Sequence, residues 1–137
     1  MTLPGRLPVG DGHVLAYDLR GAADAPCALI LHGGPGSGIA QAHWHLFDPA
    51  SWRVAAFDQR GCGASRPLAA EDTAALSVQS LADHIADIEA LRTHLGIARW
   101  CVFGGSWGAT LAQAYAHVHP ARVTGLVLAG VTSTRPD

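Results

Sequence analysis

The sequence predicts an α/β fold in which a doubly wound, mostly parallel sheet is covered by helices on both faces. Short apolar runs alternate along the chain with amphipathic stretches, and three of these runs end abruptly in glycine-containing turns. Strands that are apolar on both faces belong to sheets covered on both sides, as in parallel α/β proteins. The chain has 137 residues, which fits one domain, 1–137, with a modest core.

Five segments have the composition of strands. The first, residues 14–19, follows a turn-like Gly-Asp-Gly and is expected to form one arm of a hairpin. The other four are wholly or largely apolar and are expected to lie inside the sheet: Cys27–Leu31, Arg53–Phe57, residues 100–103 and residues 123–128.

Two helices are expected to connect these strands. Residues 81–95 carry leucines and isoleucines at successive spacings of 4, 3, 3 and 4, which is one stripe at the helical period. Ser80 and Asp83 resemble a capping pair, and Gly96 is a suitable stop. A second helix is expected from about residue 107 to 119, before Pro120. The segments 37–52 and 61–79 are expected to form loops and short helices.

Composition excludes several classes of partner. The net charge is −2 and 15% of the residues are charged, which argues against nucleic acid or an anionic membrane as the main partner. The three cysteines form no CxxC pair, which is typical of reduced thiols in a cytoplasmic protein. No signal peptide and no apolar run long enough to span a membrane is recognisable, so a cytoplasmic location is expected.

The strongest chemical motif is GGSWG (residues 104–108), a G-x-S-x-G sequence between an apolar strand and a helix start. A sharp strand-to-helix turn lifts the serine hydroxyl above the sheet, and small neighbours avoid a clash with the adjoining strand and helix. A chance match is the competing interpretation, and the strand before the motif and the helix after it count against chance. We therefore expect Ser106 to be a catalytic nucleophile.

A second glycine-rich turn, HGGPG (residues 32–36), directly follows the first buried strand. An oxyanion hole needs backbone N–H groups aimed at a developing negative charge. One is expected from Trp107, the residue after the serine, and the other from this turn. Gly34 is the best candidate for the oxyanion hole, with Gly33 next. Considered alone, the loop would by default be an ordinary Gly/Pro turn, and its occurrence together with the serine turn favours the oxyanion hole.

Four segments in this order resemble the proline iminopeptidases (prolyl aminopeptidases), which are serine peptidases of the α/β-hydrolase fold: HGGPG (32–36), DQRGCGAS (58–65), ADIEALRTHLGI (86–97) and GGSWGATLA (104–112). The resemblance extends from about residue 32 to 128. It is more specific than G-x-S-x-G alone, which lipases, esterases and epoxide hydrolases share in part. It implies an incomplete α/β-hydrolase fold, with about the first six strands present and the cap and C-terminal part absent.

The resemblance also implies a reaction, the release of N-terminal proline from small peptides. Ser106 would attack the carbonyl after the proline and form an acyl-enzyme that water hydrolyses, while the N–H groups of Gly34 and Trp107 hold the oxyanion. No metal and no organic cofactor is expected. Residues 58–60 would form a supporting turn beside the nucleophile.

The acid and base of a catalytic triad are expected beyond residue 137, because this fold orders them after the serine. His117 and His119 follow Ser106 by at least eleven residues on one helix, which is more than ~16 Å at ~1.5 Å per residue. Asp137 is the last residue. The histidines that precede the serine are expected to be structural or solvated: His32, His43, His45 and His84.

Without a base, the chain alone is expected to lack useful peptidase activity. Two alternatives stay open: another α/β-hydrolase such as an esterase or acyltransferase, and a non-catalytic truncated remnant that needs a partner chain. An epoxide hydrolase would usually carry aspartate in place of Ser106. Residues 123–128 would form an apolar, unpaired edge, so self-association through that edge is a further expectation.

Overall fold

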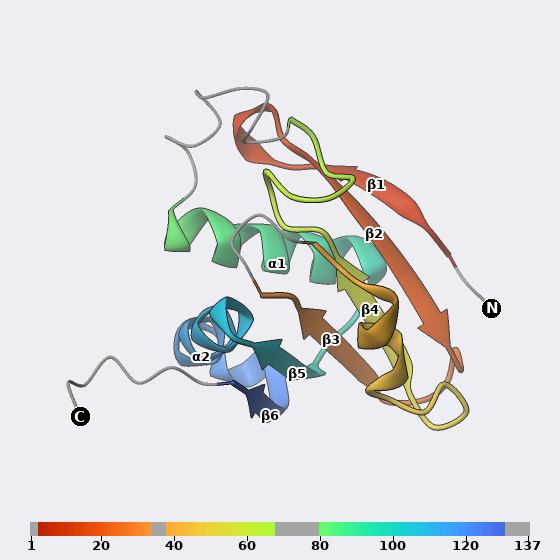
Figure 1. Ribbon diagram of the computed structural model, residues 1–137. Coiled ribbons are helices and arrows are strands. Elements are labelled where there is room, and N and C mark those ends of the chain that lie inside the picture. The colour runs from red at the N-terminus through yellow and green to blue at the C-terminus, as the bar shows by residue number, and fades with distance from the viewer. Residues whose placement is uncertain (1–2, 34–37, 68–79, 131–137) are drawn as a thin grey trace.

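In the computed structural model the chain forms a six-stranded sheet flanked by two α-helices (Figure 1). The structure describes residues 3–33, 38–67 and 80–130. The strands are β1 (Gly5–Pro8), β2 (Val14–Gly21), β3 (Cys27–Leu31), β4 (Arg53–Phe57), β5 (Trp100–Gly105) and β6 (Val123–Ala129). The α-helices are α1 (Leu81–Leu95) and α2 (Trp107–Val118), and the 3-10 helices are η1 (Gly10–Gly12), η2 (Gln41–His45) and η4 (Pro120–Arg122).

The strand order is β1-β2-β4-β3-β5-β6, and the four strands from β3 to β6 run parallel. The predicted mostly parallel sheet is therefore confirmed. Strands β1 and β2 form the expected hairpin, and β2 joins the sheet by antiparallel pairing with β4. The sequence did not predict β1, because its four residues, GRLP, are few and end in proline.

The direction of each crossover decides which face of the sheet a connection covers. The chain moves from β3 to β4 in one direction along the sheet, and from β4 to β5 and β5 to β6 in the other. Because parallel crossovers are right-handed, α1 and α2 share one face and η2 lies on the opposite face (Figure 1). Both faces are covered as expected, but the second face carries only a short 3-10 helix and loops within the described residues.

The core consists of two layers, one on each face of the sheet. The larger layer joins the inward side chains of α1 and α2 to those of the strands, and Trp100, Ile88 and Leu111 are fully buried in it. The smaller layer contains Ile30 and Phe103, with tryptophans and Phe47 of the segment around η2 packed against them. Burial on both faces explains why the parallel strands are continuous apolar runs.

The ends of α1 lie where the sequence predicts them. The Ser80 hydroxyl accepts a hydrogen bond from the Asp83 N–H (3.1 Å), and the Asp83 carboxylate accepts one from the Ser80 N–H (3.1 Å). At the other end, Gly96 adopts a left-handed conformation with φ 69°. Within the described residues, neither α-helix is long and apolar enough to cross a membrane.

Strand β6 is one edge of the sheet and pairs only with β5 among the described strands. Leu126 is 39% exposed and Val127 is 46% exposed. The strand carries no charged residue and no proline, whereas β1 at the opposite edge carries Arg6 and Pro8. The charge and the proline on β1 protect that edge against pairing with another chain, and β6 lacks both forms of protection.

Candidate active site

The candidate site lies where two neighbouring strands send their connections to opposite faces of the sheet. Strand β3 leads to η2 on one face, and β5 leads to α2 on the other. In open α/β sheets such a reversal opens a crevice at the carboxyl ends of the strands. Gly33 follows β3 and Ser106 follows β5, and a Cβ on Gly33 would lie 3.4 Å from the Ser106 Cβ. The sheet thus brings the two predicted motifs together.

The Ser106 backbone has φ 54° and ψ −118°, a conformation that residues with a side chain rarely adopt. The turn is tight because both flanking glycines are in close contact with backbone. A Cβ on Gly104 would overlap the Gly108 carbonyl, and a Cβ on Gly108 would overlap the Leu31 carbonyl. The motif therefore has glycine at positions 104 and 108 for the steric reason expected from the sequence.

The Ser106 side chain is exposed at the head of α2 and opens into a cavity of about 380 Å³. The Ser106 N–H donates to the Ala129 carbonyl (3.0 Å), which fixes the turn to the end of β6. The cavity is mainly apolar. Its other lining residues are Gly33, Ala42, His43, Leu46, Phe103 and Gly105. An uncharged acyl group fits such a lining better than an ionised one does.

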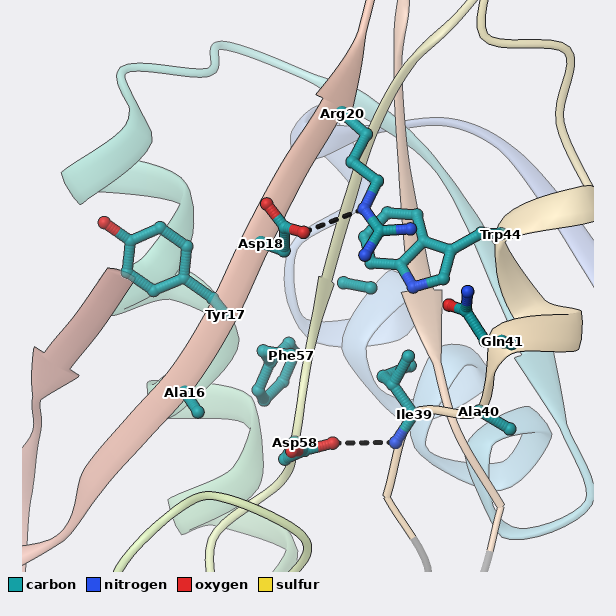
Figure 2. Close-up of a pocket in the computed structure, with 11 residues that line it drawn as sticks. Ala16, Tyr17, Asp18, Arg20, Ile39, Ala40, Gln41, Trp44, Phe57 and Asp58 are labelled. Carbon is teal, nitrogen blue, oxygen red and sulfur yellow. Dashed lines mark hydrogen bonds and ion pairs between the residues drawn. The ribbon is translucent and has the colours of Figure 1, made fainter. Parts of the chain in front are cut away.

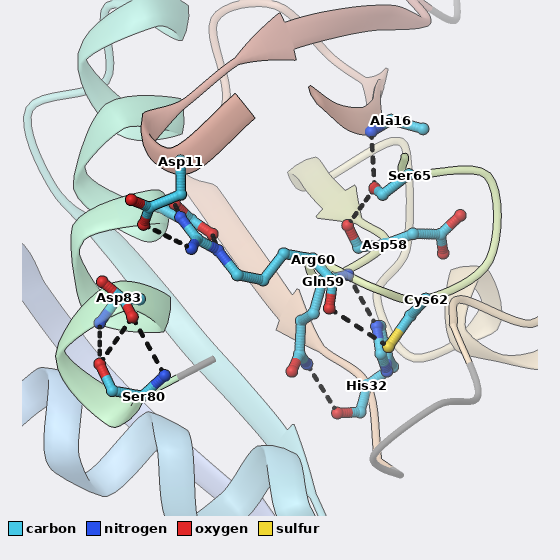
Figure 3. Close-up of polar contacts among 11 residues, drawn as sticks. Asp11, Ala16, His32, Asp58, Gln59, Arg60, Cys62, Ser65, Ser80 and Asp83 are labelled. Carbon is cyan, nitrogen blue, oxygen red and sulfur yellow. Dashed lines mark hydrogen bonds and ion pairs between the residues drawn. The ribbon is translucent and has the colours of Figure 1, made fainter. Parts of the chain in front are cut away.

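Gln59 connects the two motifs through its side-chain amide. Its Nε2 donates to the His32 carbonyl (3.0 Å), and its Oε1 accepts from the Trp107 indole Nε1 (2.9 Å). Figure 3 shows Gln59 and His32 side by side at the turn after β4. The indole of Trp107 is thereby held in place. As the first residue of α2, Trp107 has a backbone N–H with no acceptor inside the helix.

His32 is buried and has both ring nitrogens engaged. Its Nε2 accepts from the Gln59 N–H (3.0 Å), so the proton of the neutral ring is on Nδ1, which donates to the Gly33 carbonyl (2.6 Å). Burial lowers the pKa of His32 below its ordinary value, although the bond to Gly33 opposes this shift. A neutral ring with both nitrogens occupied orients the turn after β3 and is a poor proton acceptor, as the sequence analysis expected.

A buried ion pair fixes the turn after β4 to helix α1. Arg60 Nε and Nη2 donate to the two carboxylate oxygens of Asp87 (2.7 and 2.8 Å), and Nη1 reaches Asp11 (3.2 Å; Figure 3). The hydrogen bonds to Asp87 raise the pKa of Arg60. The Asp58 carboxylate accepts from the Ile39 N–H (2.7 Å) and the Ala64 N–H (2.9 Å). Residues 58–60 therefore support the turn, as predicted.

Not every predicted site residue can be located. Gly34 lies outside the described residues, and so does Asp137. His117 and His119 lie at the end of α2 opposite to Ser106, as expected. Among the described residues, no histidine or carboxylate forms a hydrogen bond with the Ser106 hydroxyl.

Two residues near Ser106 have surroundings that sequence reasoning did not predict. His43, which was expected to be solvated, lines the same cavity as Ser106, and its Nδ1 accepts from the Ala40 N–H (2.8 Å). His84 is buried against Trp107, with ring centroids 5.9 Å apart, and burial lowers its pKa. No spacing in the sequence marks either contact.

Comparison with known proteins agrees with this geometry. Residues 29–137 match the family described as alpha/beta hydrolase fold. The chain is 47% identical over 134 residues to a proline iminopeptidase of Neisseria meningitidis, covering 97% of this chain and 41% of the relative. It is 48% identical over 127 residues to a proline iminopeptidase of Arabidopsis thaliana, covering 93% and 32% respectively.

A solved structure of a proline iminopeptidase-related protein from Thermus thermophilus matches with a TM-score of 0.79 and 29% identity. That match covers 93% of this chain and 44% of the other. The chain thus spans between 32% and 41% of the length of the two curated relatives above.

Proposed function

The chain belongs to the α/β-hydrolase family, and we propose that it supplies the nucleophile and oxyanion-binding elements of a serine peptidase that releases N-terminal proline from peptides. The observation that carries the proposal is the backbone turn at Ser106, together with Gly33 after β3, which lies beside it. The similarity to proline iminopeptidases of Neisseria meningitidis and Arabidopsis thaliana supports the choice of substrate. The reduced, non-disulfide state of Cys27, Cys62 and Cys101 suits a cytoplasmic location.

In the proposed reaction, the Ser106 oxygen attacks the carbonyl that follows the N-terminal proline. The carbonyl oxygen becomes an oxyanion, and the N–H groups of Trp107 and Gly34 stabilise it. Collapse of this intermediate breaks the peptide bond, releases the shortened peptide as an amine and leaves proline esterified to Ser106. Water then hydrolyses the ester. Gln59 contributes by holding the Trp107 indole and the His32 carbonyl in fixed positions.

Attack by Ser106 requires a base that accepts its proton. Among the described residues, no histidine or carboxylate is hydrogen-bonded to the Ser106 hydroxyl. A triad histidine contributes about 10⁶-fold to kcat in a serine protease, and an oxyanion hole with binding alone leaves about 10³-fold over water. We therefore expect the 137-residue chain by itself to have very weak peptidase activity. The one described histidine that lines the Ser106 cavity is His43.

The pH dependence of labelling by a fluorophosphonate probe tests the nucleophile. If Ser106 is positioned without a base, its labelling rate should rise about tenfold per pH unit through the neutral range, since only the alkoxide reacts. The Ser106→Ala variant should not be labelled. A plateau near neutral pH would mean that a histidine acts as base, and its loss in His43→Gln would identify that histidine. Absence of labelling at every pH, in folded protein, would contradict the proposal.

A chimera tests the proposed substrate. The matching segment of the Neisseria meningitidis relative is replaced by this chain, and hydrolysis of proline and alanine aminomethylcoumarin amides is compared. We expect the proline amide to be preferred and Ser106→Ala to abolish the activity. A folded chimera that hydrolyses simple esters but neither amide would favour an esterase.

A further inference from the structure

A second cavity, of about 310 Å³, lies on the η2 face of the sheet and does not include Ser106. It runs between β2, the end of β4 and the segment 39–44 (Figure 2). The segment around η2 separates it from the Ser106 cavity, because Ala40, Gln41 and Trp44 line this groove whereas Ala42 and His43 line the other. Its volume is at the lower end of the range typical of small-ligand sites.

One end of the groove holds a guanidinium that is fixed before any ligand arrives. Arg20 Nε donates to Asp18 Oδ2 (2.8 Å), and the guanidinium carbon lies 3.9 Å from the centroid of the Trp44 ring. Asp18 is itself held, because its Oδ1 accepts from the Leu19 N–H (2.8 Å). Arg20 remains 34% exposed. An arginine held by stacking and by one ion pair can offer its terminal nitrogens to a carboxylate with little loss of side-chain entropy.

The other end of the groove holds the carboxylate of Asp58, as Figure 2 shows. Each of its oxygens accepts one backbone N–H, from Ile39 and Ala64. A carboxylate has about four acceptor positions, so it can accept further hydrogen bonds. Among the described residues, Asp58 forms no ion pair. This end of the groove is therefore suited to a cationic donor.

The middle of the groove is apolar and extended. Ala16 and Ile39 line it between the two charged ends (Figure 2), and Ala56 is also among its lining residues. The Asp58 N–H bonds to the Ala16 carbonyl and Arg20 pairs with Val54, so the ends are separated by about 13 Å of strand at ~3.3 Å per residue. Figure 2 shows Arg20 extending from β2 to the Trp44 ring and the Asp58 carboxylate directed toward the Ile39 N–H. An extended chain of two or three residues spans about 7–10 Å, and a hydrogen bond of about 2.9 Å at each end brings the length to about 13–16 Å, which matches this separation.

We propose that this groove binds a short peptide of two or three residues with both termini free. The amino group lies at Asp58, the terminal carboxylate lies at Arg20, and small side chains pack on Ile39 and Ala56. A simple anion is a poorer ligand, because Asp18 and Asp58 together outnumber the single guanidinium. The inference does not rest on the chemistry of Ser106, which is outside the groove.

Isothermal titration of the 137-residue chain with trialanine tests the proposal. N-acetyl-trialanine lacks the amino group, and trialanine amide lacks the carboxylate. Because charge-assisted hydrogen bonds are the strong ones, we expect each capped peptide to bind at least about tenfold more weakly than free trialanine. Equal affinity for the free and both capped peptides, or no binding at millimolar peptide, would overturn the proposal. If acetate binds as tightly as trialanine, the groove is a simple anion site, and this outcome would also overturn the proposal.

Variants of the chain show which terminus lies at which end. Arg20→Gln should weaken the binding of free trialanine by about tenfold. It should leave the affinity for trialanine amide unchanged, since the amide has no carboxylate that Arg20 could bind. Arg122→Gln is the matched control, because the Arg122 side chain donates a hydrogen bond to the Ala98 carbonyl and is not in the groove. Asp58→Asn should lower the affinity for free trialanine and leave the affinity for N-acetyl-trialanine unchanged. If Asp58→Asn does not fold, the comparison of free and acetylated peptide on the unmodified chain decides the same point.

Discussion

Among single residues, Ser106 has a backbone conformation that costs folding free energy. Its φ of 54° and ψ of −118° lie outside the regions that residues with a Cβ prefer. Strain of this kind costs about 1–3 kcal/mol and is kept where surrounding structure enforces it. Glycine adopts the same conformation without the Cβ clash. The position of the proposed nucleophile is therefore one where the proposed function and stability conflict.

We therefore expect the free energy of unfolding of Ser106→Gly to be about 1 kcal/mol higher than that of Ser106→Ala. Alanine keeps the backbone strain, and glycine removes it. Denaturant titration of the two variants measures the difference. Neither variant has the hydroxyl, so loss of its contacts cancels in the comparison. Equal stabilities would mean that the turn is not strained in solution.

His32 predicts a dependence of stability on pH. Burial lowers its pKa in the folded chain below the ordinary value of about 6.5. The unfolded chain therefore binds a proton at a higher pH than the folded chain does, and the contribution of His32 to stability is present above pH ~6.5 and is lost as the pH falls toward the folded pKa. Burial also lowers the pKa of His84, so its contribution to stability is lost over the same direction of pH change. We expect denaturant midpoints to decrease between pH 7.5 and about 5.

The control for this prediction is His32→Gln, which does not titrate and can still accept from the Gln59 N–H. This variant should be less stable at pH 7.5 but should lose less stability on acidification. An unchanged slope in His32→Gln would assign the pH dependence to other groups.

The sequence predicted single residues well where a steric rule applies. Gly104 and Gly108 were expected beside Ser106 because a Cβ there would clash, and both contacts are present. The bond from Gln59 to the Trp107 indole joins residues 48 apart and obeys no spacing rule. The position of His43 beside the Ser106 cavity obeys no spacing rule either, since only the fold brings it there.

At the scale of elements, helix α2 packs unusually close to the end of β3. Gly108 is responsible, because the atoms nearest to a Cβ at this position are the backbone atoms of Leu31 and His32. In an ordinary helix, replacing glycine by alanine stabilises by up to about 1 kcal/mol. Here the gain in helix propensity is opposed by a clash with backbone that cannot rotate away.

We therefore expect Gly108→Ala to lower the free energy of unfolding by about 2–3 kcal/mol. The matched control is Gly125→Ala in β6, where the nearest atom to a new Cβ is Cys101 Sγ at 3.5 Å, an ordinary contact distance. That variant should be neutral or slightly stabilising. Thermal or urea unfolding monitored by circular dichroism separates the two, and similar losses at both positions would argue against a specific helix–strand contact.

Elements with a strong periodic or apolar pattern could be predicted from the sequence almost to the residue. Helix α1 and strands β3 and β4 have the expected bounds, because apolar periodicity and caps act locally. Strand β1 was missed, since its pairing with β2 and not its composition makes it a strand. The shared face of α1 and α2 follows from the strand order, which no local pattern encodes.

For the whole molecule, the edge strand β6 is the candidate contact surface between copies of the chain. Among the described strands, Val123–Ala129 pairs with β5 along one side only, and it carries no charge that would repel a second copy. Edge strands of this type pair with other chains. We propose that the isolated chain self-associates through β6.

A charge on the edge should weaken this association. We expect the average mass from sedimentation velocity to rise with concentration for the unmodified chain and to rise much less for Val127→Lys. Val118→Lys is the control, because Val118 is 55% exposed at the end of α2 and not on the edge. A monomer at all concentrations, or an equal effect of both lysines, would contradict pairing through β6.

The position of β3 in the sheet has a consequence during synthesis on the ribosome. The strand is central, yet its neighbour β5 begins about seventy residues later in the chain. At roughly 5–20 residues per second, the ribosome needs about 4–14 s to deliver β5 after β3 has been made. For that time one side of an apolar strand has no native partner. Among the described strands, the strand that precedes Gly33 therefore waits longest for its native neighbour, and its apolar side is a site for chaperone binding during synthesis.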